Sequence, residues 1–317
     1  MKTLVTGGAG FIGSTLVDRL LAEGHSVDVV DDLSSGSLAN LHDARSDPAH
    51  DYSFHRLDIR SDGVVGLIAH RRPEVVFHLA AQADVRVSVA EPAFDAQVNI
   101  IGTINILEGA RQAGSRKVVL AASGGTLYGE TGKLPIKESA KQQPLSPYGV
   151  SKKAAMDYLT AYRELHGLEV TSLALGNIYG ARQDPHGEAG VVAIFAGKLL
   201  NGETCTIFGD GEQTRDFVYV DDVVDAFSRA ATRGDGLVIN IGTGSETSVN
   251  HLYSVMASAA GVDAPPEYAP PRTGELRRSS LDPSRAALHL GWKPWTSIEE
   301  GASQVLRWFR DRAPEGG

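Results

Sequence analysis

Two residues four positions apart, Tyr148 and Lys152, have side chains suited to proton transfer. In a helix this spacing places both side chains on one face. A free phenol has a pKa of about 10 and is a poor base at neutral pH, but a nearby ammonium favours the phenolate. The pair therefore predicts acid–base chemistry on a hydroxyl group. Taken alone, it could equally be an exposed tyrosine and lysine on an ordinary helix.

A glycine-rich segment at the start of the chain gives this pair a context. Gly7, Gly10 and Gly13 follow a β-branched run and open an amphipathic segment. In such a loop the first glycine allows a tight turn, the second lets the backbone approach a pyrophosphate, and the third allows close helix–strand packing. The spacing predicts a dinucleotide site that includes Phe11 and Ile12, with the pyrophosphate at the helix N-terminus.

Two adjacent carboxylates, Asp31 and Asp32, end the second predicted strand, about 20 residues past the loop. An acidic residue there accepts hydrogen bonds from ribose hydroxyls and repels a 2′-phosphate. We therefore predict NAD rather than NADP, with Asp31 as the first choice and Asp32 as the second. The alternative is a solvated pair of carboxylates at a strand end.

Further cofactor contacts are predicted where later strands end. Asp58, followed by Ile59, could meet the adenine amino group, although a turn or helix-capping aspartate would look the same. The small residues of Leu79-Ala80-Ala81 would let a cofactor lie close to the backbone. The preceding His78 is better explained as a packed core histidine than as a catalyst.

Alternation of short β-branched runs with helical segments predicts the elements that position these residues. The expected fold is α/β: a doubly wound, parallel-sheet Rossmann domain with a smaller C-terminal α/β substrate-binding region. We assign residues 1–176 to the cofactor domain, with 217–242 returning to it, and 177–317 mainly to the substrate. Predicted strands are Thr3–Thr6, Ser26–Val30, Tyr52–Leu57, Val75–Leu79, Lys117–Ala121, Val170–Ala174, Thr206–Phe208, Phe217–Val220 and Leu237–Ile241, and predicted helices include Gly13–Glu23, Val64–His70, Phe94–Gln112, Tyr148–Leu165, Val191–Leu200 and Ile298–Asp311.

Composition narrows the partners of the 317-residue chain. Its net charge of −9, without a basic run, argues against nucleic acid. A single cysteine, Cys205, excludes a disulfide framework and a cysteine metal cluster, so no metal is expected. No signal-peptide pattern and no apolar stretch of membrane length is present. We therefore expect a cytoplasmic enzyme that binds no membrane.

The chain resembles the extended short-chain dehydrogenase/reductase family, and within it the UDP-glucose 4-epimerase-like enzymes. The resemblance rests on four motifs and spans nearly the whole sequence. They are Thr6-Gly7-Gly8-Ala9-Gly10-Phe11-Ile12-Gly13, Ser146-Pro147-Tyr148-Gly149-Val150-Ser151-Lys152, the segment 209–222 that begins Gly209-Asp210-Gly211 and ends Val220-Asp221-Asp222, and Leu290-Gly291-Trp292-Lys293-Pro294.

The resemblance implies a reaction in which Tyr148 takes the proton of a sugar 4-hydroxyl while hydride moves to NAD, and the 4-keto sugar receives the hydride on its other face. Lys152 would bind the cofactor ribose and lower the tyrosine pKa. By the same resemblance, Asn99 contacts the cofactor. The residues implied for the UDP or dTDP sugar are Asn177, Val191, Thr206, Phe208, Arg215, Arg272 and Glu275.

One position departs from the family pattern. Many relatives carry serine or threonine where this chain has Gly124, so Ser123, ranked first, or Thr126 must supply the active-site hydroxyl. Neither Gly124 nor Gly125 brings the carboxyl group of the dehydratases and decarboxylases, and this absence favours epimerisation.

Several alternatives stay open. UDP-glucuronate 4-epimerase and a non-catalytic nucleotide-sugar sensor are the rivals of a UDP-hexose epimerase. A small residue at Ser279 would leave room for an N-acetyl group, and Arg86 or Arg182 could meet a uronate carboxylate. The helices Phe94–Gln112 and Tyr148–Leu165 resemble the pair that forms a four-helix contact in dimeric relatives, so we expect a homodimer.

Overall fold

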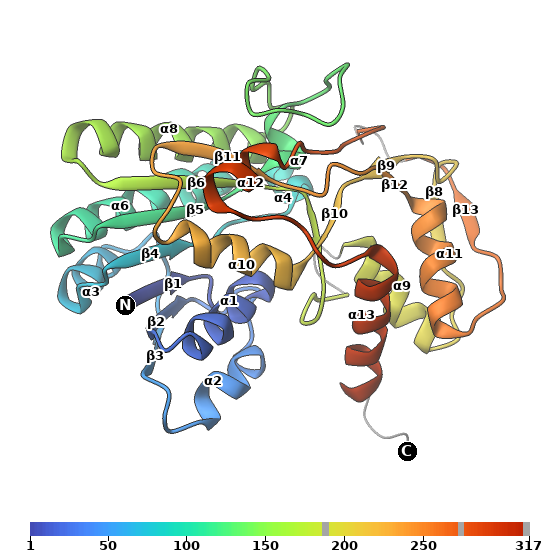
Figure 1. Ribbon diagram of the computed structural model, residues 1–317, viewed down its shortest axis with the longest axis horizontal. Coiled ribbons are helices and arrows are strands. Elements are labelled where there is room, and N and C mark those ends of the chain that lie inside the picture. The colour runs from blue at the N-terminus through green and yellow to red at the C-terminus, as the bar shows by residue number, and fades with distance from the viewer. Residues whose placement is uncertain (186–189, 272–275, 313–317) are drawn as a thin grey trace.

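A seven-stranded, entirely parallel sheet is the framework of the protein (Figure 1). The computed structural model describes residues 1–185, 190–271 and 276–312. The strand order is β11-β6-β5-β4-β1-β2-β3, which reverses direction at β1 as in doubly wound folds. The strands are β1 (Lys2–Thr6), β2 (Ser26–Asp31), β3 (Tyr52–Arg56), β4 (Val75–His78), β5 (Lys117–Ser123), β6 (Glu169–Leu175) and β11 (Leu237–Ile241).

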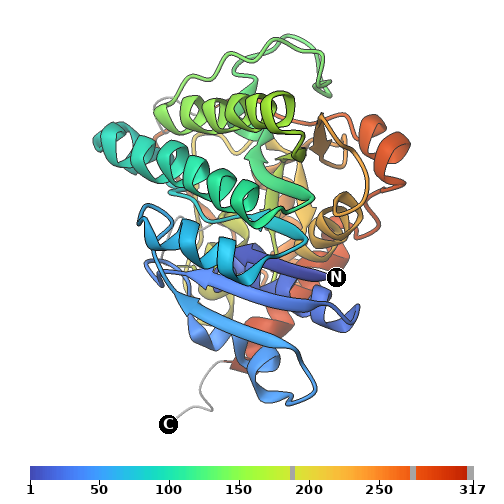
Figure 2. The ribbon, with the colours of Figure 1, turned by 90° about the vertical axis from the view of Figure 1, so that its left-hand side faces the viewer.

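Helices cover both faces of the sheet because its strands are apolar on both sides. One face is covered by α3 (Gly63–Arg71), α6 (Gly102–Ala113) and α8 (Pro147–His166), of which α6 and α8 lie side by side in Figure 2. The other face is covered by α1 (Phe11–Ala22) and α10 (Val220–Ala230). This arrangement leaves the carboxyl ends of the strands open for a site.

The predicted sheet strands are confirmed except at Phe217–Val220. The corresponding strand, β10 (Phe217–Tyr219), pairs with β7 (Asn177–Tyr179) in a separate two-stranded sheet, because the chain bends at Gly176 after β6. A side chain at Gly176 would lie 2.9 Å from the carbonyl of Asp216, so the bend brings the two segments into direct contact. Leu237–Ile241 does return to the main sheet, beside β6.

The long helix predicted over Phe94–Gln112 is present and runs without a break, but it is not α-helical throughout. The segment comprises α5 (Pro92–Ala96), a π-helical turn η2 (Gln97–Ile101) and α6. A π-turn inserts an extra residue into the helix and is frequent at functional sites. Here it contains Asn99, which points its side chain inward, only 2% exposed.

The remaining elements form a smaller part of the chain, shown at the right in Figure 1. Three helices there pack on one another and three short strand pairs connect them to the main sheet. The sequence patterns did not predict α10, α11, α12 or the short strand β13. The elements are α9 (Val191–Leu200), α11 (Val249–Ala260), α13 (Ile298–Arg312), β8 (Thr206–Phe208), β9 (Thr214–Arg215), β12 (Thr247–Ser248) and β13 (Glu267–Ala269). Helix α12 (Ser284–Leu290) packs instead against β11 and α10 of the main sheet.

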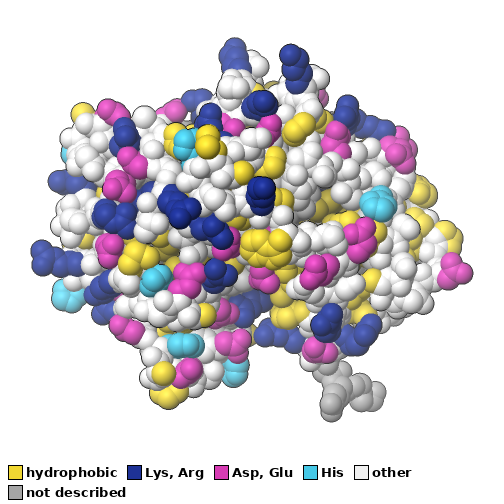
Figure 3. Space-filling model, viewed as in Figure 1, with side chains coloured by type: hydrophobic (Ala, Val, Ile, Leu, Met, Phe, Trp, Pro, Cys, Tyr) yellow, Lys and Arg dark blue, Asp and Glu magenta, His cyan; other side chains and the backbone are white. Residues whose placement is uncertain are grey.

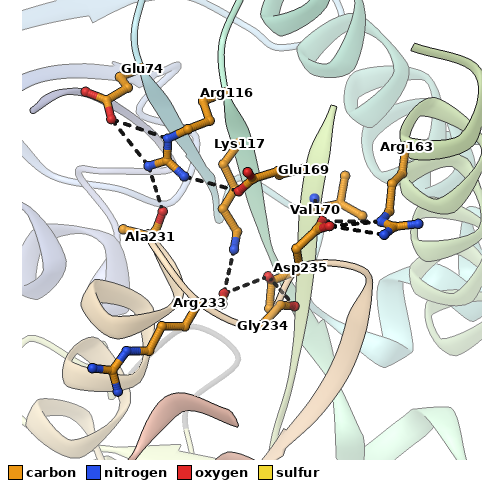
Figure 4. A network of polar contacts seen from close by, with 11 residues as sticks. Glu74, Arg116, Lys117, Arg163, Glu169, Val170, Ala231, Arg233, Gly234 and Asp235 are labelled. Carbon is orange, nitrogen blue, oxygen red and sulfur yellow. Dashed lines mark hydrogen bonds and ion pairs between the residues drawn. The ribbon is translucent and has the colours of Figure 1, made fainter. Parts of the chain in front are cut away.

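A polar network joins the amino ends of β5, β6 and β11, at the edge of the sheet remote from the strand ends discussed below (Figure 4). The fully buried Lys117 donates from Nζ to the carbonyl of Arg233 at 2.5 Å, and burial lowers the pKa of Lys117 to about 8. Arg116 joins Glu74, Glu169 and the carbonyl of Ala231. The network fixes this edge of the sheet, where no site residue is predicted.

On the face seen in Figure 3, basic and acidic side chains are interspersed, and neither charge forms a large patch. Among the helices that the structure describes, none is long and apolar enough to cross a membrane.

Candidate active site

The glycine loop brings α1 against the ends of β1 and β4. Gly7 has a φ of +69°, and a side chain there would lie 2.6 Å from the backbone nitrogen of Ala80. A side chain at Gly13 would lie 2.0 Å from the carbonyl of Gly7. Both positions therefore require glycine for close approach. Gly10 caps α1, whose positive end faces the strand ends, as a pyrophosphate site requires.

The two carboxylates after β2 have different surroundings. Asp31 is 7% exposed, accepts from Ala9 N at 2.9 Å and from Leu33 N at 2.8 Å, and so touches the glycine loop. Burial raises its pKa, against these two hydrogen bonds, which lower it. Asp32 accepts from Ser34 in an exposed turn. Asp31 is hydrogen-bonded to the glycine loop, and its oxygens can accept further hydrogen bonds. It therefore fits the ribose of a dinucleotide better than Asp32 does.

The other predicted cofactor residues lie at neighbouring strand ends. Asp58 binds Arg60 with both oxygens, and the ion pair lowers the pKa of Asp58, so its observed contacts are those of a turn residue. Ile59 packs against Gly102, where a Cβ atom would lie only 2.5 Å from Ile59 Cδ1. Leu79, Ala80 and Ala81 are half-buried between β4 and α4 (Val85–Ala90).

His78 is a core residue, as predicted. It is 1% exposed, and its ring nitrogens bind the hydroxyls of Thr6, at 2.7 Å, and Thr103, at 3.0 Å. Burial, together with the nearby charge of Lys152, lowers the pKa of His78 to about 3. The ring is therefore neutral at physiological pH.

Tyr148 and Lys152 lie on the first two turns of α8. Ser146 caps the helix by accepting from Gly149 N at 3.1 Å, and Pro147 occupies the first turn. Lys152 Nζ lies 5.9 Å from the centre of the Tyr148 ring and donates to the carbonyl of Ala121 at 3.1 Å. Tyr148 is half-buried whereas Lys152 is 5% exposed, and burial lowers the pKa of Lys152 to about 8.

Asn99 connects the π-turn to α8. Its Oδ1 accepts from Gln82 N at 3.0 Å, and its Nδ2 lies within hydrogen-bond distance of Gln82 O, Asp95 Oδ1 and Ser151 Oγ. These contacts make Asn99 a link between α5 and the residue that precedes Lys152. Its predicted contact with the cofactor stays a prediction.

The structure explains the glycine at position 124. A side chain there would lie 2.4 Å from Leu281 Cδ1 and 3.1 Å from the carbonyl of Leu175, so no serine or threonine fits without displacing Leu281. Ser123 ends β5 and is half-buried. Thr126 Oγ1 is buried and has no hydrogen-bond partner among the described residues. That Ser123 rather than Thr126 acts as the hydroxyl stays a prediction.

The predicted substrate residues lie on short elements around the open edge of the sheet. Asn177 begins β7, Val191 begins α9, Thr206 and Phe208 belong to β8, and Arg215 ends β9. Arg272 and Glu275 lie outside the described residues. The roles of all seven as substrate contacts remain predictions.

Asp216 is a residue that our sequence reasoning missed. It is fully buried and accepts from the backbone nitrogens of Thr243, Gly244 and Leu281, while its own carbonyl accepts from Asn177 N. It therefore ties together four chain segments, two of which carry predicted substrate residues, Asn177 and Arg215.

Two arginines considered for a uronate carboxylate already bind carboxylates. Arg182 lies 2.6 Å from Asp18 of α1, and Arg86 lies 2.8 Å from Asp84. Ser279 is buried. Among the residues that the structure describes, there is no cluster of three metal-binding side chains.

Comparison with known proteins gives matches along nearly the whole chain. A family model described as GDP-mannose 4,6 dehydratase matches residues 4–305. A UDP-glucose 4-epimerase of Mycolicibacterium smegmatis is 52% identical over 314 residues, which cover 99% of this chain and 100% of that protein.

Solved structures match equally well. UDP-glucose 4-epimerase of Thermotoga maritima, crystallised with UDP-glucose, has a TM-score of 0.94 and 47% identity, covering 98% of this chain and 99% of that one. The Thermus thermophilus UDP-glucose 4-epimerase, in complex with NAD, has a TM-score of 0.90 and 42% identity, covering 99% and 100%. The predicted Rossmann-type fold is thereby confirmed.

The different surroundings of Asp31 and Asp32 give a first prediction. Asp31→Ala should weaken NAD binding about 10- to 100-fold, because a charge-assisted hydrogen bond contributes about 1.5–3 kcal/mol. Asp32→Ala, the matched control, should change it less than about twofold. Calorimetric titration of NAD into stripped protein measures both. Loss of binding in Asp32→Ala alone would reverse the assignment.

The contact between Gly124 and Leu281 gives a second prediction. Gly124→Ser should lower stability by about 1–3 kcal/mol, since Leu281 must move out of a packed core. Gly125→Ser is the control, because a side chain there meets no atom within 4 Å. Thermal unfolding followed by calorimetry should show a lower midpoint for the first variant only. Equal midpoints for both variants would show that Leu281 yields without cost.

Proposed function

The chain belongs to the GDP-mannose 4,6 dehydratase family of extended short-chain dehydrogenases/reductases, and we propose that it is an NAD-dependent UDP-hexose 4-epimerase of the UDP-glucose/UDP-galactose type. The observation that carries the proposal is the pairing of Tyr148 with the buried Lys152 beside the glycine loop. The names of the relatives that match over nearly the full length support the same reaction.

NAD fits the residues present. Gly7 and Gly13 make the close approaches that such a loop needs, and Asp31 stands beside it. When bound, NAD would supply the reversible hydride transfer for oxidation and reduction at the sugar C4. Phe11, Ile12, Asp58, Ile59, Asn99 and the segment 79–81 complete the proposed cofactor site.

Tyr148 is the proposed proton acceptor for the sugar 4-hydroxyl and the donor in the return step. The ammonium of Lys152 favours its phenolate, and the hydroxyl of Ser123, or of Thr126, would orient the reacting oxygen. The same tyrosine serves in removal of the proton and in its return, since oxidation and reduction occur at one carbon.

The substrate side of the proposal includes the short elements after β6. Asn177, Val191, Thr206, Phe208 and Arg215, with Arg272 and Glu275, would bind the nucleotide and diphosphate. Arginine suits a diphosphate because its planar fork aligns two donors. We accordingly assign residues 1–176 mainly to NAD and 177–317 mainly to the nucleotide sugar, with β11 contributing to the sheet.

Epimerisation is favoured over related reactions by the residues at the start of α7 (Gly124–Leu127). Gly124 and Gly125 supply no carboxyl group for elimination or decarboxylation. A neutral hexose is favoured over glucuronate, because Arg86 and Arg182 already bind Asp84 and Asp18. A sensor without catalysis is disfavoured because it would not need a tyrosine beside a buried lysine.

We further propose that the enzyme is a cytoplasmic homodimer. Exposed apolar side chains gather on four elements that pack on one another, namely α4, α5, η2 and α8. They are Val89, Phe94, Ile101, Val150 and Tyr158. A second copy would remove these side chains from water.

A panel of nucleotide sugars tests the reaction. Purified protein without added NAD should interconvert UDP-glucose and UDP-galactose, as measured by chromatography of the products. Tyr148→Phe should reduce turnover at least about 100-fold by removing the acid–base group, while NAD stays bound. Tyr158→Phe, on the same helix, is the control and should retain full turnover. Preferential turnover of UDP-glucuronate, or undiminished epimerisation by Tyr148→Phe, would overturn the proposal.

Sedimentation analysis tests the assembly. The protein should sediment at twice the chain mass at micromolar concentration, and Val150→Glu should shift it toward the monomer by placing a charge in the contact. Leu288→Glu, at an exposed leucine of α12, should stay dimeric. A wild-type protein of single-chain mass would contradict the dimer.

A further inference from the structure

Asp95 of α5 is a buried carboxylate with one oxygen left over. Only 1% of the residue is exposed. Its Oδ1 lies 3.0 Å from Asn99 Nδ2 and 3.1 Å from Gln82 Nε2, whereas its Oδ2 is buried and has no hydrogen-bond donor among the described residues. A buried carboxylate is costly to keep ionised unless a cation compensates it. The arrangement therefore calls for a positive charge nearby.

The carboxylate of Asp95 interacts electrostatically with the ammonium of Lys152. Helices α5 and α8 pack on one another, and Asn99 Nδ2 bridges Asp95 Oδ1 to the hydroxyl of Ser151, at 3.1 Å, one residue before Lys152. The lysine ammonium donates to the carbonyl of Ala121, which carries no charge. Both members are at least 95% removed from solvent, so water screens their attraction weakly.

We propose that Asp95 is the positioning residue and counter-ion of Lys152, which keeps the lysine charged so that Tyr148 can ionise. The inference rests on the proposed function of the Tyr148–Lys152 pair. In this proposal Asp95 acts through the lysine and not directly on the substrate or the cofactor.

The groups facing Lys152 make Asp95 the only source of negative charge among the described residues. From β4, His78 is neutral, and from α8, Tyr148 is the group to be ionised. Burial lowers the pKa of Lys152 to about 8, and the charge of Asp95 opposes this effect. Without that charge the pKa of Lys152 is lowered further by burial. The ammonium then loses its proton nearer neutral pH, and the phenolate loses its stabilising cation.

The test is Asp95→Asn in the protein with bound NAD. The amide keeps the size of the side chain and an acceptor for Asn99 while removing the charge. We expect the alkaline limb of the kcat profile to move to lower pH by about one unit, with kcat at pH 8 reduced about tenfold and KM changed less than about twofold. Asp157→Asn is the matched control, since this exposed carboxylate pairs with Lys153, the next residue on α8, and its loss should leave the limb unchanged.

A second readout does not need turnover. Tyrosinate absorbance, taken as the difference between each protein and its Tyr148→Phe counterpart, reports the ionisation of Tyr148. Asp95→Asn should raise the apparent pKa of Tyr148 by about one unit. An unchanged limb together with an unchanged titration would overturn the role of Asp95. Lack of epimerisation by the wild type would instead count against the proposed function, and the titration would still test Asp95.

A charge-conserving variant covers the case in which Asp95→Asn does not fold. Asp95→Glu retains the negative charge and should keep the tyrosinate titration within about half a unit of the wild type. A shift of a full unit in folded Asp95→Glu would show that shape, not charge, is what matters at this position, and would also overturn the proposal.

Discussion

The ammonium of Lys152 has to remain charged although it is buried away from water. Much of the surrounding structure follows from this requirement. Removing a cation from water costs several kcal/mol unless hydrogen bonds and an opposite charge compensate it. The end of β5 offers the carbonyl of Ala121, and α5 offers the carboxylate of Asp95. The π-turn places Asn99 between Asp95 and Ser151 and so fixes the spacing of the two helices.

The neutrality of His78 belongs to the same requirement. The Thr103 hydroxyl donates to the carbonyl of Asn99, so His78 Nε2 must be the donor to Thr103, and Nδ1 accepts from Thr6. The Thr6 oxygen in turn accepts from Ala80 N. An uncharged His78 ring satisfies each donor and acceptor in this series of hydrogen bonds, and a second cation beside Lys152 is avoided. The same bonds join the ends of β1 and β4 to the π-turn, which is the floor of the proposed NAD site.

Much of this architecture could be predicted from the sequence, because its signals are local. The sheet strands are short apolar runs, and the spacings of Gly7, Gly10 and Gly13 and of Tyr148 and Lys152 are read within one element. Helix α10, which was missed, carries two carboxylates, Asp222 and Asp225, on its buried face. Asp222 accepts from Trp295 N and Thr296 N, far along the chain. Asp95 and Asp216 were missed for a similar reason, since the partners that explain a buried carboxylate are set by tertiary structure.

The glycine at position 124 departs from the family pattern and allows Leu281 to pack against the end of β5. The space that a serine or threonine side chain would occupy is filled by Leu281, whose backbone nitrogen donates to Asp216 and whose strand-like contact is with Ile136. Asn240 secures the other side, since it accepts from the buried Tyr128 hydroxyl and donates to the carbonyl of Ile136. The segment that follows Arg272 and Glu275 is thus packed directly against the end of β5. Strand β5 also provides Ser123 and the carbonyl bound by Lys152. The absence of a side chain at Gly124 therefore lets the segment around Leu281 pack close to the proposed proton-transfer pair. In the proposal, the active-site hydroxyl comes from a neighbouring position instead.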